Sequence, residues 1–166
     1  REDRETMIAA SRTQTAMSHN NPLVVESAEF FARVLWHVLR GSAPTAAMEH
    51  VCGKELNEDT VGEWVGAGIK STGVDTRSAI AGFGQACEIE MALPSTVHLI
   101  AKYENDLKAS LVENVMAGGD SASRGMLAGM VLGAPLGYGA IPEIWLRELN
   151  KARRIAELLN RIDDRC

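Results

Sequence analysis

The feature that most constrains this fold is an uncharged stretch from Gly125 to Ile141 in which glycine recurs at every fourth position. Four glycines share this spacing: Gly125, Gly129, Gly133 and Gly137. In an α-helix, residues four apart lie on one face, and a face of glycines allows another backbone to approach closely. Each interior glycine costs a helix about 0.5–1 kcal/mol relative to alanine, so such a helix needs packed neighbours. We therefore expect a buried helix at the centre of the fold.

A membrane-spanning helix is the alternative interpretation of this stretch. The stretch contains 17 residues, of which five are glycine and one is proline. A spanning helix needs about 20 predominantly apolar residues. The composition therefore favours a core helix, and no membrane span is expected.

The clearest amphipathic helix is expected over residues 21–40. Asn21 is suited to cap it, Pro22 to occupy its first position and Gly41 to end it. A second amphipathic helix is expected from Pro142 to the C-terminus, with an apolar stripe formed by Trp145, Leu149, Ala152, Ala156 and Leu159. Both segments indicate a helical protein.

The remaining segments predict shorter helices, and Ser95 and Asn105 are candidate caps for two of them. These helices are expected near 5–17, 45–52, 58–69, 95–103 and 106–116, with a loop over 88–94. No run of four or more residues combines strand-like alternation with β-branched residues and flanking turns. The sequence therefore predicts an all-α fold, a multi-helix bundle in which residues 1–166 form a single domain.

The charge and the cysteines exclude several classes of protein. Lys and Arg total 17 against 22 Asp and Glu, and the net charge of -5 gives no overall attraction to phosphate backbones. Nucleic acid is therefore not expected as a partner. The three cysteines are widely spaced and form no C-x-x-C pair, which argues against a disulfide framework or a zinc knuckle. We expect an intracellular, soluble protein of the cytoplasm or an organelle matrix, since no apolar signal core follows the charged N-terminus.

Two motifs carry information about function. The first reads Gly-Gly-Asp-Ser-Ala-Ser-Arg-Gly over 118–125, and after the small-residue helix it continues with Ala-Ile-Pro-Glu-Ile-Trp-Leu over 140–146. The second reads Ser-His-Asn-Asn-Pro over 18–22. Together they resemble the ADP-ribosylglycohydrolase family, whose Thr-His-x-x-Pro turn the second motif matches. The first motif is closest to the J-crystallin-like and selenoprotein-like branch, and the resemblance corresponds to the C-terminal half of the family's usual domain.

The resemblance implies an incomplete helical domain with a cleft for two Mg²⁺ ions, in which a glycosidic bond of ADP-ribose is hydrolysed. The family's Asp-x-Asp-Thr metal motif falls on Asp120, Ala122 and Ser123, so its second carboxylate is lost. The family's Thr-Asp-Asp-Thr ligands and Gly-Asn-Gly loop are absent. By resemblance, Asp120 and Ser123 are candidate metal ligands, and the candidate ligand-binding residues are His19, Asn20, Gly118, Gly119, Ser121 and Arg124.

Each of these residues also has a structural interpretation. Asp120 is as well suited to cap the following helix as to bind a metal, and the two roles are compatible. His19 either lines the ADP-ribose cleft or bonds to the backbone of its own turn. The glycines before the helix favour an anion at its N-terminus, a weak signal when taken alone. Arg124 either binds a phosphate or pairs with Glu113 or Asp120.

The other polar residues favour structural roles. His37 and His98 fall inside helical patterns and are interpreted as helix-surface or core-edge residues, while His50 is too isolated to predict a zinc site. Asp75, in a loop between glycines, is more typical of a turn former than of a cleft residue. No Ser-containing G-x-S-x-G elbow is present.

Two hypotheses about function remain open. In the first, the chain is part of a hydrolase whose Mg²⁺ site is completed by oxygens from elsewhere, because one carboxylate and one hydroxyl alone make a poor Mg²⁺ site. In the second, the fold is kept and catalysis lost, as in a crystallin-like protein or an accessory subunit. Because half of the usual domain is missing, we expect exposed apolar surface and hence a homo-oligomer or a partner chain.

Overall fold

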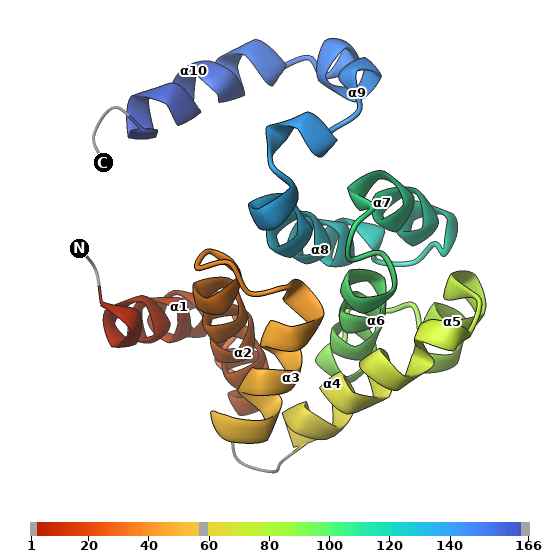
Figure 1. The fold of residues 1–166 in the computed structure, drawn as a ribbon. Coiled ribbons are helices and arrows are strands. Elements are labelled where there is room, and N and C mark those ends of the chain that lie inside the picture. The colour runs from red at the N-terminus through yellow and green to blue at the C-terminus, as the bar shows by residue number, and fades with distance from the viewer. Residues whose placement is uncertain (1–2, 57–59, 164–166) are drawn as a thin grey trace.

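The structure, a computed structural model, describes residues 3–56 and 60–163. Within these residues it contains ten α-helices, two short 3-10 helices and no strand (Figure 1), so the all-α prediction is confirmed. The α-helices are α1 (Arg4–Ser18), α2 (Pro22–Val38), α3 (Pro44–Lys54), α4 (Thr60–Lys70), α5 (Thr76–Phe83), α6 (Ile89–Lys102), α7 (Leu107–Met116), α8 (Ser121–Leu136), α9 (Glu143–Glu148) and α10 (Ala152–Asp163). The 3-10 helices are η1 (Ser71–Gly73) and η2 (Tyr138–Ala140). None of the helices in the described ranges is long and apolar enough to cross a membrane.

Side-chain caps set several helix starts. Asn21 caps α2 as predicted, because its Oδ1 accepts a hydrogen bond from the Leu23 N–H at 2.9 Å and Pro22 occupies the first position. The start of α7 differs from the prediction, since its cap is Asp106 and not Asn105. Asp75 is the cap of α5, a helix that the sequence did not predict. The predicted start near residue 58 lies outside the described residues.

The central helix of the fold is α6. It packs against α4, α5 and α8 (Figure 1), and every residue from Leu93 to Ile100 is buried. The prediction of a loop over 88–94 followed by a cap at Ser95 is therefore wrong. Pro94 has no N–H group, so the carbonyl of Glu90 lacks its usual helical partner. Glu90 is exposed in the first turn of α6, where water can take the place of that partner.

The glycine-rich helix α8 lies beside α6 and is buried on one side only. Its buried residues are Arg124, Ala128, Val131 and Leu132, whereas the side chains of Met126 and Met130 are 69% and 45% exposed. A Cβ on Gly125 would lie 2.9 Å from Asn114 Nδ2, but one on Gly133 would meet no atom within 4 Å. The prediction of a fully buried, central helix is therefore wrong. Another helix approaches closely only at the start of α8, whereas Gly133 and Gly137 face open space.

The C-terminal segment forms two helices in place of the single predicted one. The break falls between α9 and α10, where Leu149 adopts an extended conformation with ψ 110°. Figure 1 shows α10 lying apart from the helices α1–α8. Its apolar side chains consequently stay exposed, with Ile155 at 45% and Leu159 at 49%. On the polar side of this helix, Arg153 Nε donates to Glu157 Oε1 at 3.1 Å.

Candidate functional site

The turn between α7 and α8 carries most of the predicted site residues. Gly118 and Gly119 have φ angles of +72° and +64°, in the left-handed region that favours glycine. A Cβ on Gly119 would lie 2.1 Å from the carbonyl oxygen of Gln85, so the close packing of this turn also requires glycine. The two glycines therefore have structural roles that are independent of any ligand.

Gln85, in the connection between α5 and α6, holds this turn in place. Its carbonyl accepts a hydrogen bond from the Asp120 N–H at 2.9 Å, and its Nε2 donates to the Ala117 carbonyl. Nothing in the sequence near Gln85 indicated this role, because the contact joins residues more than thirty positions apart. Sequence reasoning therefore missed the residue that positions the turn.

Asp120 caps α8, as one of its two interpretations predicted. Its Oδ1 accepts a hydrogen bond from the Ser123 N–H at 3.3 Å. Ser123 and Ala122 are exposed in the first turn of the helix, and Ser121 is half-buried. The carboxylate and the two serine hydroxyls therefore gather at the N-terminus of α8.

Arg124 lies beneath this turn with only 1% of its surface exposed. Its Nε donates to Asn114 Oδ1 at 3.0 Å, and its Nη2 donates to the Gly118 carbonyl. Burial lowers the pKa of the guanidinium, and the negative charge of Asp120 partly opposes that shift. Glu113, the other carboxylate considered for Arg124, pairs with Arg77. In this arrangement Arg124 supports the turn from inside.

The turn offers too few oxygens for a complete Mg²⁺ site. Mg²⁺ prefers six oxygen ligands and is usually held by one or two carboxylates together with waters and substrate phosphates. Asp120 supplies one carboxylate, already engaged as a cap, and the side chain of Ala122 supplies no oxygen. The residues present therefore do not fit a self-sufficient Mg²⁺ site.

A hollow of about 500 Å³ lies beside the turn, between α7, α8 and α9. Ser121 and Ala122 from the first motif line it, together with Gly125. Trp145, from the 140–146 segment of the same motif, lines its other side and is 36% exposed. The fold thus brings the two separated parts of the motif to one cavity. The sequence placed Trp145 in an apolar stripe and in the 140–146 segment of the motif, but neither pattern predicted that it lines a cavity.

The second motif lies elsewhere. His19 and Asn20 are exposed in the turn between α1 and α2, and His19 Nδ1 lies 2.9 Å from Ser18 Oγ. Figure 1 shows this turn at the far end of α2, well away from the turn between α7 and α8. The chain therefore does not bring His19 and Asp120 together.

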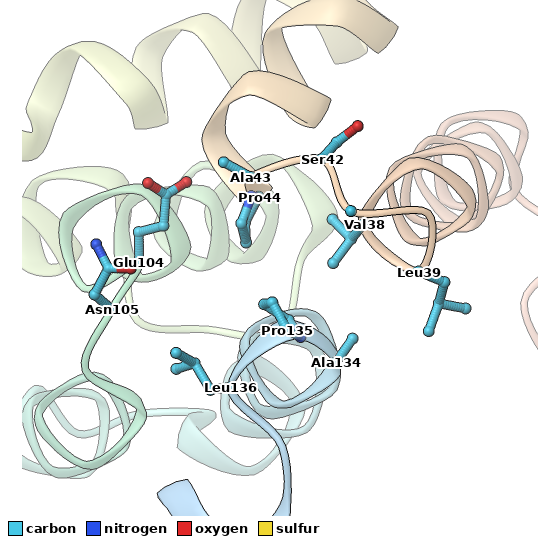
Figure 2. A pocket seen from close by; sticks show the side chains of 11 residues that line it. Val38, Leu39, Ser42, Ala43, Pro44, Glu104, Asn105, Ala134, Pro135 and Leu136 are labelled. Atoms are coloured by element: carbon cyan, nitrogen blue, oxygen red, sulfur yellow. The ribbon is translucent and has the colours of Figure 1, made fainter.

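Another hollow, of about 490 Å³, lies where the C-terminal ends of α2 and α8 meet the turn between α6 and α7. Figure 2 shows Val38, Pro44 and Pro135 converging on it. Its acidic residue, Glu104, has a structural role, because Oε1 accepts a hydrogen bond from the Thr45 N–H at 2.6 Å. Glu104 thereby caps α3, whose own N-cap residue is Ala43. This hollow contains none of the predicted site residues.

The histidines fall into two groups. His98 has a structural role, as interpreted, but it is fully buried and hydrogen-bonded to Ser71 and Thr76, and therefore lies inside the core and not at the helix surface or core edge. His50 was expected to be too isolated for a zinc site, and the structure shows that it is not isolated. Its ring centroid lies 4.8 Å from that of His37, and both imidazoles face the carboxylate of Glu55.

Comparison with known proteins identifies a family. A family model described as ADP-ribosylglycohydrolase matches residues 1–166. No curated protein and no solved structure matches the chain.

Cys52 and Cys87 form no disulfide within the described residues, and Cys166 lies outside them.

Proposed function

The chain belongs to the ADP-ribosylglycohydrolase family, and from this premise we propose that it binds an ADP-ribose glycoside in the hollow between α7, α8 and α9. The observation that carries the proposal is that Ser121 and Trp145, from the two parts of the motif, line the same cavity. Its volume of about 500 Å³ falls in the range of ligand sites, about 300–1,000 Å³.

The lining suits the two ends of such a ligand. Trp145 offers an aromatic face on which an adenine ring can stack, an interaction worth about 1–3 kcal/mol in single-stranded nucleic acid recognition. The start of α8 lies at the positive end of the helix dipole, which favours a phosphate group, while its Ser121 and Ser123 N–H groups already donate to the Gly119 carbonyl and to Asp120. His19 and Asn20 remain predicted ligand-binding residues. Because they lie away from this hollow in the same chain, they would reach it only from a partner copy of the chain.

In this proposal the chain contributes to hydrolysis of the glycosidic bond only when other oxygens complete the metal site. Asp120 and Ser123 are the proposed Mg²⁺ ligands on this chain. The remaining oxygens come from the bound phosphates or from another chain, since the side chain at position 122 supplies none. A partner that covers the exposed apolar surface of α8 and α10 is the source that we favour.

The second candidate function is that of an inactive, accessory subunit. Two observations favour it: the methyl side chain of Ala122 where the family motif has a carboxylate, and the distance between the turns that carry His19 and Asp120. The two candidates differ in one respect, which is whether bound ADP-ribose glycosides are cleaved.

Calorimetric titration with ADP-ribose tests the binding site. We expect Trp145→Ala to weaken binding at least fivefold, in line with the loss of one stacked base. Trp36→Ala is the matched control, because Trp36 stacks on Arg40 and does not line the hollow. Equal affinities of the two variants and the wild-type chain, or no heat at all, would contradict the proposed site.

Restoring the lost carboxylate tests the role of the metal. Ala122→Asp is expected to increase the affinity for Mg²⁺ measurably, and Asp120→Asn in that background to remove the gain. Release of ADP-ribose from an ADP-ribosylated protein, followed by mass spectrometry with and without Mg²⁺, then separates the two candidates. If the wild-type chain and Ala122→Asp both bind the ligand and neither cleaves it, the accessory role is supported.

A further inference from the structure

Two histidines and a glutamate meet between α2 and α3, and none of them lines the hollow between α7, α8 and α9. His37 lies in the last turn of α2, His50 lies in α3, and Glu55 follows the C-terminal end of α3. His37 Nε2 lies 2.8 Å from Glu55 Oε1, and His50 Nε2 lies 3.3 Å from the same oxygen. All three ligand atoms lie within 4.8 Å of one another.

The two carboxylate oxygens of Glu55 have separate partners. Oε2 is held by the guanidinium groups of Arg4 from α1 and Arg33 from α2. Oε1 is the oxygen that faces the imidazoles. Salt bridges and hydrogen bonds to the outer oxygen fix the orientation of a ligating carboxylate, and such support is typical around metal sites in proteins. The glutamate is therefore held with one oxygen directed at both histidines.

We propose that His37, His50 and Glu55 form a binding site for a divalent transition-metal ion of the Zn²⁺ class. Two imidazoles and one carboxylate are a ligand set that Zn²⁺ takes when it keeps a fourth position for water or another ligand. Mg²⁺ and Ca²⁺ are excluded because they prefer oxygen ligands. This inference is independent of the proposed ADP-ribose site.

The separations between the ligand atoms suit such an ion. With bonds of about 2.0–2.2 Å in a tetrahedral arrangement, ligand atoms lie about 3.3 Å apart, close to the 2.8 Å and 3.3 Å observed between the imidazoles and Glu55. The third separation, between ligand nitrogens of the two imidazoles, lies within 4.8 Å, so side-chain rotations that bring these nitrogens to about 3.3 Å complete the arrangement. The side chain of His50 is 43% exposed, which leaves the ion a path from solvent and room for a fourth ligand.

The surrounding charges limit the affinity without preventing binding. Arg4, Arg12 and Arg33 lie in the same network, and Glu29 and Glu55 offset two of their three positive charges. The positive charge of Arg40 also acts on His37, so a divalent ion adds to a cluster that already carries a net positive charge. We expect binding weaker than that of a four-ligand structural zinc site, which has more anionic ligands.

The experiment is a titration of the full chain, stripped of metal and of any polyhistidine tag, with ZnCl₂ in a calorimeter. One ion per chain is expected. His37→Ala and His50→Ala should each weaken binding at least tenfold, while His19→Ala, which removes an exposed histidine outside the cluster, should leave it unchanged. Titration with Co²⁺ provides a second readout, since three protein ligands and one water give the intense visible absorption of a four-coordinate site.

Three outcomes would overturn the proposal: no binding by the wild-type chain, equal binding by His50→Ala, or loss of binding in Asp120→Asn with retention in His50→Ala. The last outcome would place the ion at the turn between α7 and α8. His50→Ala is the decisive variant, because this partly exposed side chain can be removed without emptying the core. Its circular dichroism spectrum and melting temperature without metal establish that it is folded.

Discussion

The side chain of Asn114 joins α7 to both Arg124 and the first turn of α8. Its Oδ1 accepts a hydrogen bond from Arg124 Nε at 3.0 Å, and its Nδ2 donates to the Ser121 carbonyl at 2.7 Å. Asn114 and Arg124 are each 1% exposed, so water cannot replace these bonds. This pair holds the turn that presents Asp120 to solvent.

Replacing Asn114 with Ala is expected to destabilise the chain by about 2–4 kcal/mol. The substitution leaves the Nε of the buried, cationic Arg124 without its partner and removes one of the two donors to the Ser121 carbonyl, and an unpaired buried group costs about 1–3 kcal/mol, more when charged. Urea unfolding followed by circular dichroism measures the effect. Ser110→Ala is the matched control on the same helix, because the buried Ser110 Oγ has no hydrogen-bond partner among the described residues. The control is expected to be neutral or slightly stabilising, and equal losses in the two variants would contradict the role of Asn114.

Gly68 sets the close contact between α4 and α6. A Cβ at this position would lie 2.6 Å from the Pro94 carbonyl oxygen and 2.8 Å from Val97 Cβ. Gly68→Ala is therefore expected to destabilise the fold by about 1–3 kcal/mol through overpacking. Gly66→Ala, two residues away on the same helix, meets no atom within 4 Å and should stabilise it by about 0.5–1 kcal/mol. Thermal melts of both variants check the opposite signs, and shifts in the same direction would contradict the contact.

His98 makes the stability of the fold depend on pH. Burial lowers the pKa of His98 to about 4, and the positive charge of Lys102 contributes to the same shift. In the unfolded chain the imidazole gains its proton near pH 6.5, so between about pH 6.5 and pH 4 the unfolded state binds a proton that the folded state does not. Stability is therefore retained above this window and falls by about 3 kcal/mol as the pH decreases through it.

The measurement is the free energy of unfolding in urea from pH 4 to pH 8, compared between the wild-type chain and His98→Gln. Glutamine does not titrate, so the difference between the two curves isolates the histidine from the carboxylates. Over this window we expect the free energy of unfolding of the wild-type chain to change more steeply with pH than that of His98→Gln, and the difference in slope to correspond to up to one bound proton. Parallel curves would contradict the assignment.

The exposed apolar side chains predict self-association or a partner chain. Met126 is 69% exposed and Val115 63% exposed on neighbouring helices, and the apolar side of α10 is uncovered as well. Light scattering at micromolar concentration is expected to detect a dimer or a larger species, and Met126→Glu together with Met130→Glu to shift it towards monomer. A monomeric wild-type chain that binds no apolar dye would contradict this prediction.

The helical class and the caps at Asn21 and Asp120 could be predicted from the sequence because they depend on local signals. Asn21 and Pro22 specify the start of α2 through hydrogen bonds and dihedral angles that lie within four residues of each other. The same local rules failed at Pro94. A proline is usually a reason to place a loop, but here the burial of the surrounding apolar residues outweighs one missing hydrogen bond.

The glycine-rich stretch shows the limit of periodicity. The spacing correctly predicted a helix with a face of glycines. Periodicity cannot predict, however, whether another element covers that face. In the fold, Leu111 and Asn114 approach the first part of the face, while Gly133 meets nothing within 4 Å. Coverage is a property of the neighbouring helices and cannot be found within the stretch itself.

The sequence by itself therefore determined the helical class, the family, and the residues that turn the chain before α8. Those features arise from contacts over a few residues or from motifs that can be recognised as written. Only the tertiary structure decided that Gln85 holds the turn, that Trp145 and Ser121 share a hollow, and that His37 and His50 meet at Glu55. These groupings join residues distant in the chain, and the packing of the helices that carry them is what places their side chains within bonding distance.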